Sequence, residues 1–156
     1  MDWYGIGDTI SMKKIIISFL VVFTFGLFWN CSTIPSEKNH NLQRKWMLVS
    51  FSNFTKEQLI KSKAAISLTA EKESGKIPGS AFMGCNRMFF TSDFKDNGKV
   101  KISGLGGTMM ACSNMELENS FAQSFENMTH YLIRGHELIL SDEKGNEMKF
   151  IAADWD

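Results

Sequence analysis

The sequence predicts an α+β domain in which one amphipathic helix accompanies a mainly antiparallel sheet, curved or half-closed into a small barrel of about seven strands. Three observations support this fold class. Short segments with alternating apolar residues recur, one segment alone has a helical period, and glycine-containing turns join the last strands. The chain has 156 residues, of which 44% are hydrophobic and 22% charged, which suits a single packed core.

The first half of the domain is expected to consist of strands. Asp96-Asn97-Gly98 predicts a type I′ hairpin turn, because asparagine and glycine adopt the positive φ angles which that turn requires. Serine, glycine and proline residues at 74–79 break the chain before a longer run begins at Ala81. The strands expected here are Lys45–Phe51, Ala65–Ala70, Ala81–Phe94 and Lys99–Leu105.

One segment has a helical period and predicts a helix over about residues 114–129. Ser113 and Glu116 have the spacing of a capping box at its start. We interpret its apolar stripe as core; the alternative is that Phe121 and Phe125 line a ligand site. The stripe consists of Leu117, Phe121, Phe125 and Met128, and the outward face is assigned to Glu118, Asn119, Gln123 and Glu126.

Three short strands are expected after the helix. Two turns, at Arg134-Gly135-His136 and at 142–146, separate them. Connections this short predict an antiparallel meander. The strands are Tyr131–Ile133, Glu137–Leu140 and Met148–Ile151.

The start of the chain has the pattern of an export signal. Lys13 and Lys14 precede an apolar run, Ile15 to Trp29, that is shorter than the roughly 20 residues of a membrane-spanning helix. We therefore expect residues 1–30 to be a leader and secretory signal peptide, with translation beginning at Met12.

Cys31 follows at the expected cleavage point, ahead of small and polar residues. The segment resembles a bacterial lipoprotein signal, in which this cysteine becomes lipidated and attaches the protein to the membrane. With Ser32 next to it, the resemblance implies an outer-membrane lipoprotein of a Gram-negative-type bacterium with its domain in the periplasm. A signal peptide cut nearby and an uncleaved anchor are the alternatives. Residues 31–44 would form a flexible tether, and 45–156 the domain.

Two motifs within the domain, together with single residues before and after them, occur in a distinctive order and spacing. They resemble the META domain family (DUF306), which includes HslJ-type heat-shock lipoproteins, over essentially residues 45–151. The resemblance implies a compact envelope domain linked to heat-shock response and novobiocin tolerance, with no established catalytic residue. The positions are Gly84-Cys85-Asn86-Arg87 and Gly104-Leu105-Gly106-Gly107-Thr108-Met109-Met110-Ala111-Cys112, with Trp46, Leu48, Phe82, Glu118, Phe121, Leu138, Leu140, Gly145 and Phe150.

The candidate binding residues are taken from these two motifs. For Asn86 and Arg87 we favour a structural role, in which Asn86 hydrogen-bonds a turn backbone and Arg87 pairs with a carboxylate; the alternative is an anion-binding or partner-binding edge. Thr108, Met109 and Met110 are the candidates from the second motif. Its glycines lack the lysine and spacing of a phosphate-binding loop, which favours a tight bend where strands cross.

The two cysteines of the domain are expected to form a disulfide. Once Cys31 is assigned to lipid, Cys85 and Cys112 remain as an even pair in an oxidising compartment. Two buried thiols and a redox switch are the alternatives.

The sequence offers little for catalysis, metals or nucleic acid. The chain contains 17 basic and 17 acidic residues, so no net positive charge favours nucleic acid. There is no G-x-S-x-G or H-E-x-x-H motif, and His130 and His136 do not form a metal-binding pattern. We expect a monomer with no cofactor and no catalytic activity.

The domain is rich in methionine, which fills irregular cores and also forms adaptable binding surfaces or copper(I) ligands. Core packing is the expected role, and copper binding the alternative. The residues are Met47, Met83, Met88, Met109, Met110, Met115, Met128 and Met148.

These observations favour a non-catalytic envelope lipoprotein that acts in stress or antibiotic tolerance by binding an envelope partner. One alternative is a small-ligand carrier with an apolar cavity inside the curved sheet. Another is an inhibitor of a periplasmic hydrolase, which would present an exposed rigid loop at Ser74–Ser80 or Gly104–Thr108.

Overall fold

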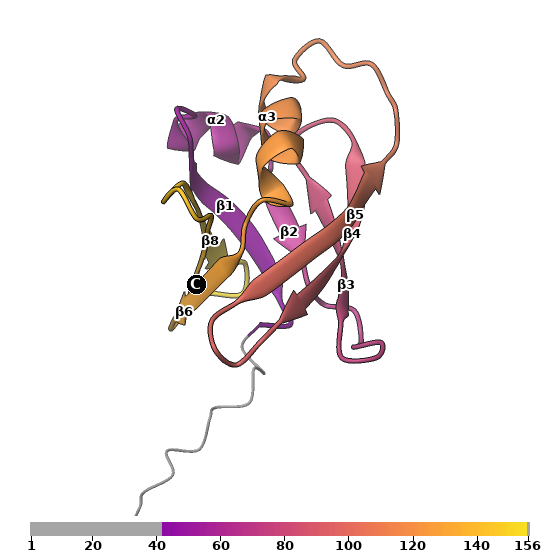
Figure 1. Cartoon of the computed structure of the whole chain (residues 1–156). Coiled ribbons are helices and arrows are strands. Elements are labelled where there is room, and N and C mark those ends of the chain that lie inside the picture. The colour runs from indigo at the N-terminus through magenta and orange to yellow at the C-terminus, as the bar shows by residue number, and fades with distance from the viewer. Residues whose placement is uncertain (1–41, 156) are drawn as a thin grey trace, which may run out of the picture. The chain divides into compact units, whose positions relative to one another are not determined.

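A computed structural model describes residues 42–155 as one antiparallel sheet with two short helices (Figure 1). The strands follow the order β5-β4-β3-β2-β1-β8-β7-β6 across the sheet. The helices are α2 (Lys56–Lys61) and α3 (Glu116–Phe125). The strands are β1 (Lys45–Phe51), β2 (Ala65–Ser67), β3 (Ile77–Phe82), β4 (Arg87–Phe94), β5 (Val100–Gly107), β6 (His130–Arg134), β7 (Glu137–Ser141) and β8 (Glu147–Ala152).

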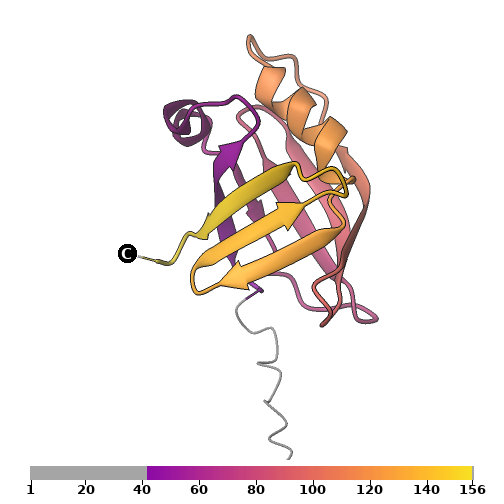
Figure 2. The same ribbon diagram turned by 60° about the vertical axis from the view of Figure 1, so that its left-hand side comes forward.

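The sheet curls until its two edge strands meet at one end, which makes a half-closed barrel. Backbone hydrogen bonds run from Val100 N to Thr129 O (2.9 Å) and from Tyr131 N to Gly98 O (2.8 Å). The predicted curved, mainly antiparallel sheet is thereby confirmed, with eight strands in place of about seven. Figure 2 shows the predicted C-terminal meander, β6 to β8, side by side in orange and yellow.

The additional strand arises in the middle of the domain. The run predicted as a single strand, Ala81–Phe94, is divided between β3 and β4 by a corner at Gly84, whose φ is +110°. Pro78 and Gly79, expected to break the chain, lie within β3. Gly79 is required there because the Phe90 ring covers it, and an added Cβ would stand 2.4 Å from that ring.

The core fills the space inside the curl, and α3 contributes its aromatic stripe to it as predicted. Phe121 and Phe125 are 0% and 1% exposed, and their rings stack with centroids 4.5 Å apart. Phe125 meets Phe90 of β4 edge-on at 4.8 Å, and Phe121 meets Phe51 of β1 at 6.4 Å. The helix therefore lies across the curl and joins its two sides.

Three details of the helical regions differ from prediction. Helix α3 is shorter than the predicted range 114–129. Its N-cap is Met115, and no side chain of the N-cap residue hydrogen-bonds to the helix. The amide of Glu116 donates to Asn114 Oδ1 in place of the predicted capping box. Glu118, assigned to the outward face, is buried at 7% exposure. Helix α2 was not predicted, although Thr55 and Gln58 form the capping box at its start.

The first hairpin turn also differs. Among the turn residues 96–98 only Gly98 has a positive φ, at +78°. A type I′ turn requires two such residues, so the turn is not type I′. Gly98 N donates to Lys95 O, and Lys95 N donates to Lys99 O. This is a type I turn followed by a glycine bulge, the usual form of a three-residue hairpin loop.

The folded domain begins before Lys45. Leu42 is fully buried in the core cluster, and its carbonyl accepts the Trp46 indole N–H at 3.0 Å. The part of the expected tether next to the domain is therefore packed. The expected signal peptide, the start at Met12 and the lipidation site Cys31 lie outside the described residues.

Candidate functional site

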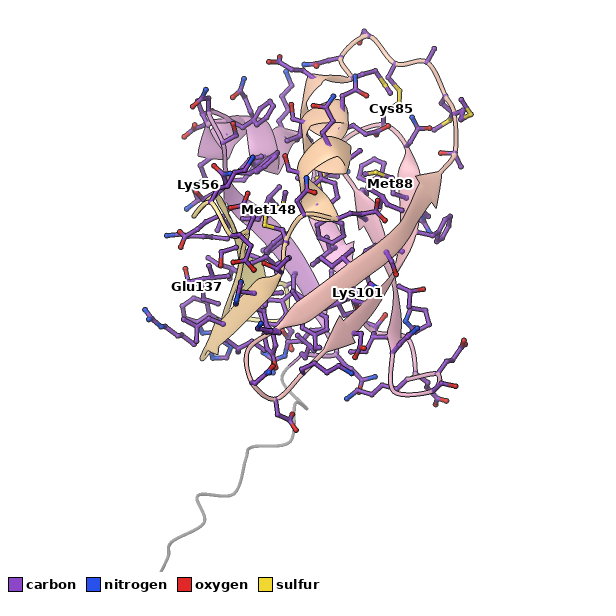
Figure 3. All side chains as sticks on the ribbon, in the orientation of Figure 1. Lys56, Cys85, Met88, Lys101, Glu137 and Met148 are labelled. Atoms are coloured by element: carbon purple, nitrogen blue, oxygen red, sulfur yellow. A yellow bond between two sulfur atoms is a disulfide. The ribbon has the colours of Figure 1, made fainter. Side chains whose placement is uncertain are left out.

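Three segments meet at one end of the domain, the first of them distant in sequence from the other two. They are the corner between β3 and β4, which carries Cys85 and Asn86, the loop Thr108–Cys112 after β5, and the first turn of α3. Figure 3 places Cys85 beside the arch of this loop, with Lys101 towards the other end of β5. All five predicted binding residues lie at or beside this junction, which we call the Asn86 corner.

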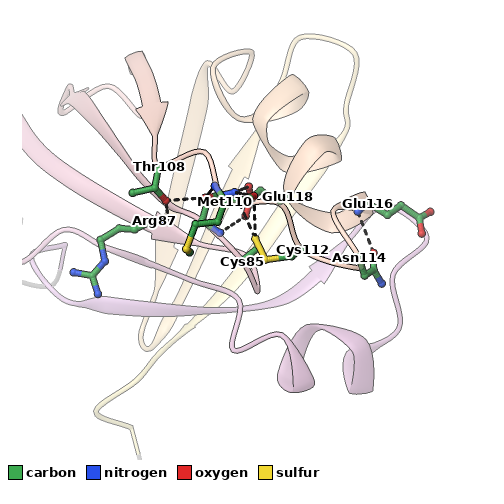
Figure 4. Close-up of a disulfide and its surroundings, with 9 residues drawn as sticks. Cys85, Arg87, Thr108, Met110, Cys112, Asn114, Glu116 and Glu118 are labelled. Atoms are coloured by element: carbon green, nitrogen blue, oxygen red, sulfur yellow. Dashed lines mark hydrogen bonds between the residues drawn. A yellow bond between two sulfur atoms is a disulfide. The ribbon is translucent and has the colours of Figure 1, made fainter.

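A disulfide between Cys85 and Cys112 closes the corner on one side (Figure 4). It joins residues 27 apart in sequence, with 6.1 Å between their Cα atoms. The predicted pairing is confirmed, and the alternative of two buried thiols is wrong. The bond ties the far end of the loop to the start of β4.

The Asn86 side chain fastens the middle of the loop. Its Oδ1 accepts the Met110 amide at 2.8 Å and the Thr108 hydroxyl at 2.7 Å. Its Nδ2 donates to Met110 O at 3.1 Å and to Glu118 Oε1 at 2.8 Å. At 3% exposure the amide has its donors and acceptors satisfied by protein, so it holds the loop in place. The predicted hydrogen bond from Asn86 to a turn backbone is confirmed.

Glu118 is the anchor of Asn86 on the helix. Its Oε2 accepts the backbone N–H of Asn86 at 2.6 Å while Oε1 accepts the side-chain N–H. The two bonds satisfy both oxygens of a buried side chain and attach the β3–β4 corner to the first turn of α3. This role of Glu118 was not predicted, although Glu118 precedes Phe121 by three residues and therefore shares its face of the helix.

Arg87 and Thr108 bring β4 against the start of the loop. Arg87 N donates to the Thr108 hydroxyl, and Thr108 N donates to Arg87 O at 3.1 Å. Gly107 is needed beside them, because an added Cβ would stand 2.6 Å from Arg87 O. The Arg87 side chain is exposed, and no carboxylate of residues 42–155 lies within ion-pair distance of it, so the expected salt bridge is not found there.

The loop fixed in this way presents two methionines to solvent. Met109 is 98% exposed and Met110 is 56% exposed. Core packing, the role expected of the domain's methionines, is therefore wrong for these two and for Met47, which is 44% exposed. It is confirmed for the four that are buried, Met83, Met88, Met128 and Met148.

The two loops proposed for a hydrolase inhibitor are mostly strand. β3 begins at Ile77, within Ser74–Ser80, and β5 continues to Gly107, within Gly104–Thr108. Gly104, with φ +71°, lies where the β4–β5 register shifts opposite Phe90, so it marks a bulge. The residues before β3, 71–76, are exposed, and so is the loop that follows Gly107.

Two surface clefts lie on the described part of the chain, and the interior of the curl is occupied by one continuous cluster of buried side chains. The larger cleft, about 670 Å³, lies between α3 and the β7–β8 turn and is lined mainly by polar side chains such as Gln123, Asn127 and Asp142. Within residues 42–155 no three histidine, cysteine or acidic side chains are grouped closely enough to hold a metal ion. Neither helix in that range is both long and apolar enough to cross a membrane.

The family model of the META domain matches residues 40–155, and the chain belongs to this family. Two solved structures share the fold. An NMR structure of a protein from Burkholderia xenovorans has 21% identity and a TM-score of 0.55, over 72% of this chain and 83% of that one. A second NMR structure has 22% identity and a TM-score of 0.55, over 72% and 91%. No curated protein matches the chain.

Proposed function

We propose that this protein is a non-catalytic envelope lipoprotein whose META domain binds a protein partner through the loop Thr108–Cys112. The anchor would be lipid on Cys31, and the binding would serve tolerance of heat or antibiotic stress. The observation that carries the proposal is the exposure of Met109 and Met110 on a loop fastened by a disulfide and by a buried asparagine.

The loop combines exposed apolar side chains with a fixed backbone, and both favour binding. Fully exposed apolar side chains gain by burial against a partner, and thioethers adapt to surfaces of different shape. A loop that is already ordered loses less conformational entropy on binding than a mobile one. The hydrogen bonds from Asn86 and the disulfide supply that order within the domain itself.

The binding part of the proposal is tested by site-specific photocrosslinking in intact cells. A photoreactive amino acid at position 109 should yield a discrete adduct, because the side chain there is directed into solvent. The matched control is position 60, where Ile60 is another exposed apolar residue, 61% exposed, on α2. Adducts at both positions, or at neither, contradict binding through this loop.

The biological part is tested by complementation. A strain lacking the protein should lose tolerance to heat or novobiocin, and the wild-type chain should restore it. The double variant Met109→Ser, Met110→Ser should fold normally and fail to restore tolerance, whereas Ile60→Ser should restore it. Full rescue by the methionine variant would contradict the proposed role of the loop.

The anchoring part is tested by the intact mass of protein extracted from membranes. The proposal predicts the mass of residues 31–156 plus three acyl chains on the new N-terminal cysteine. A mass that retains residues 12–30, or that lacks acyl chains, contradicts lipidation at Cys31.

A further inference from the structure

A second hollow of about 420 Å³ lies on the outer face of the sheet, across β1 to β4. It is distinct from the methionine loop, although Arg87 stands at the edge of both. We call it the basic groove. Its lining consists of Lys45, Lys63, Ala65, Ile66, Ser67, Ser80, Ala81, Phe82 and Arg87.

The strand register explains why the sheet is hollowed here. On the outer face Lys45 pairs with Ser67, and Ser67 pairs with Ser80, so two small hydroxyl side chains follow the lysine across the sheet. In the next row Ala65 pairs with Phe82, and Phe82 pairs with Arg87. Small side chains therefore form the floor of the groove, and the longer basic and aromatic ones stand at its sides.

The groove concentrates positive charge in a chain whose formal net charge is zero. Lys45, Lys63 and Arg87 come from three separate segments, and the lining contains no acidic residue. Within residues 42–155 none of the three forms a salt bridge. Three cations held near one another repel unless an anion lies between them.

Three carboxylates of the surrounding segments have other partners or lie on a more distant strand. Asp154, which follows β8, lies 3.8 Å from the guanidinium of Arg44. Glu137 lies on β7, separated from β1 by the whole of β8. Glu118 accepts hydrogen bonds from Asn86 in the interior of the corner. With no salt bridge to these three cations among residues 42–155, the groove can accept an external anion.

We infer that the basic groove binds a phosphate group carried by a small ligand or by a lipid headgroup. A phosphate ester carries up to two negative charges and several acceptor oxygens, which suits two ammonium groups and the planar fork of a guanidinium. The hydroxyl of Ser80 on the floor can donate to the same oxygens, and that of Ser67 can do so when Thr69 donates the hydrogen bond that joins these two residues. The volume is within the range of about 300 to 1,000 Å³ that is usual for ligand pockets.

The proposal does not depend on the methionine loop or on lipidation. Its residues take part in neither the disulfide nor the Asn86 hydrogen bonds. Only the backbone of Arg87 contacts the loop, through its hydrogen bonds with Thr108. Substituting the Arg87 side chain leaves those backbone bonds in place. The groove and the loop can therefore be tested separately.

The experiment uses the purified full chain without lipid on Cys31, so that acyl chains do not carry it onto vesicles, and two probes. Inorganic pyrophosphate represents a soluble phosphate compound, and is titrated while amide resonances are followed by NMR. Vesicles of phosphatidylcholine with and without phosphatidylglycerol represent the headgroup source, and binding is measured by co-sedimentation. Shifts confined to β1 to β4 with pyrophosphate assign a soluble ligand, and sedimentation that requires phosphatidylglycerol assigns a lipid.

The deciding variant is Lys45→Gln with Arg87→Gln, and its matched control is Lys72→Gln with Lys101→Gln, which removes two exposed positive charges elsewhere. We expect the groove variant to weaken binding of the effective probe at least about tenfold at constant salt, and the control to change it less than about twofold. Both variants should keep the wild-type denaturation midpoint. Equal weakening by the two variants, or no binding of either probe by the wild type, overturns the inference.

Discussion

The Asn86 corner and the C-terminal meander both contain ordered connections between strands, but the hydrogen bonds that order them differ in range. In the β7–β8 turn the bonds are local: Asp142 accepts the amides of Lys144 and Asn146, and also the Asn146 side chain. In the corner, the bonds from Asn86 reach Met110 and Glu118, which are 24 and 32 residues away. The turn orders itself, whereas the corner is ordered only when β4, the loop and α3 are all in place.

This difference determines how much of the domain is destabilised when a connection is lost. A local turn restricts only a few residues and can form early in folding. Its loss therefore affects one hairpin. A long-range junction closes large loops of chain, so its loss should affect the whole domain and above all the exposed loop. The methionine loop thus depends on distant residues, whereas the hairpins of the meander do not.

The largest effect is expected from removal of the disulfide. Because Cys85 and Cys112 close a loop of 27 residues, the variant with alanine at both positions should lose about 3.5 kcal/mol of unfolding free energy. Chemical denaturation of the full chain measures this loss, with the wild type under reducing conditions as the comparison. A loss below about 1 kcal/mol would show that the bond does not restrain the unfolded chain as the loop-closure model requires.

Substitution of Asn86 should come next. Asn86→Ala leaves the Met110 amide and one oxygen of buried Glu118 without their partners, which should cost about 3 kcal/mol. The matched control is Asn97→Ala in an exposed turn, where the side chain accepts one amide, from Lys99; it should cost about 1 kcal/mol or less. Equal losses in denaturation experiments would remove the distinction between the two kinds of connection.

The smallest effect is expected in the meander turn. The hydrogen bond from the Asn146 side chain, followed by backbone amides, lowers the pKa of Asp142 below its ordinary value of 3.8. A lowered pKa stabilises the folded state at pH values above the unfolded pKa, and that contribution disappears as the pH falls through the folded pKa. Asn146→Ala should raise the pKa of Asp142 and leave the loop Thr108–Cys112 undisturbed. NMR titration of the Asp142 carboxyl, with Asp96 as a second exposed aspartate, checks this.

Sequence patterns were sufficient for several structures that depend on neighbours along the chain, but not for all of them. The alternation in β1, the helical stripe of α3 and the glycine turns of the meander were all predicted correctly. The missed helix α2 has six residues, with only Leu59 buried, and is too short to show a period. The split of the long run into β3 and β4 depends on the conformation of Gly84, which the apolar pattern does not reveal.

The candidate sites could be predicted only in part, because they depend on register and long-range contact. The two motifs identified Asn86 and Met109, and counting cysteines identified the disulfide. The basic groove could not be found in this way: Lys45 and Arg87 come together only through the pairing of four strands, and the neutral total charge gives no sign of them. Glu118 was misplaced because a charged residue was assumed to be exposed.

Hydrogen exchange at the Met110 amide tests the central claim, that long-range contacts hold the exposed loop in one conformation. That amide donates to Asn86 Oδ1 at 2.8 Å although the Met110 residue is 56% exposed. In the oxidised wild-type protein its exchange should be slowed to the rates of the β-sheet amides, and Asn86→Ala should abolish that protection while leaving the amides of β6 to β8 protected. Exchange of the wild-type Met110 amide at the rate of an unstructured peptide would contradict the claim.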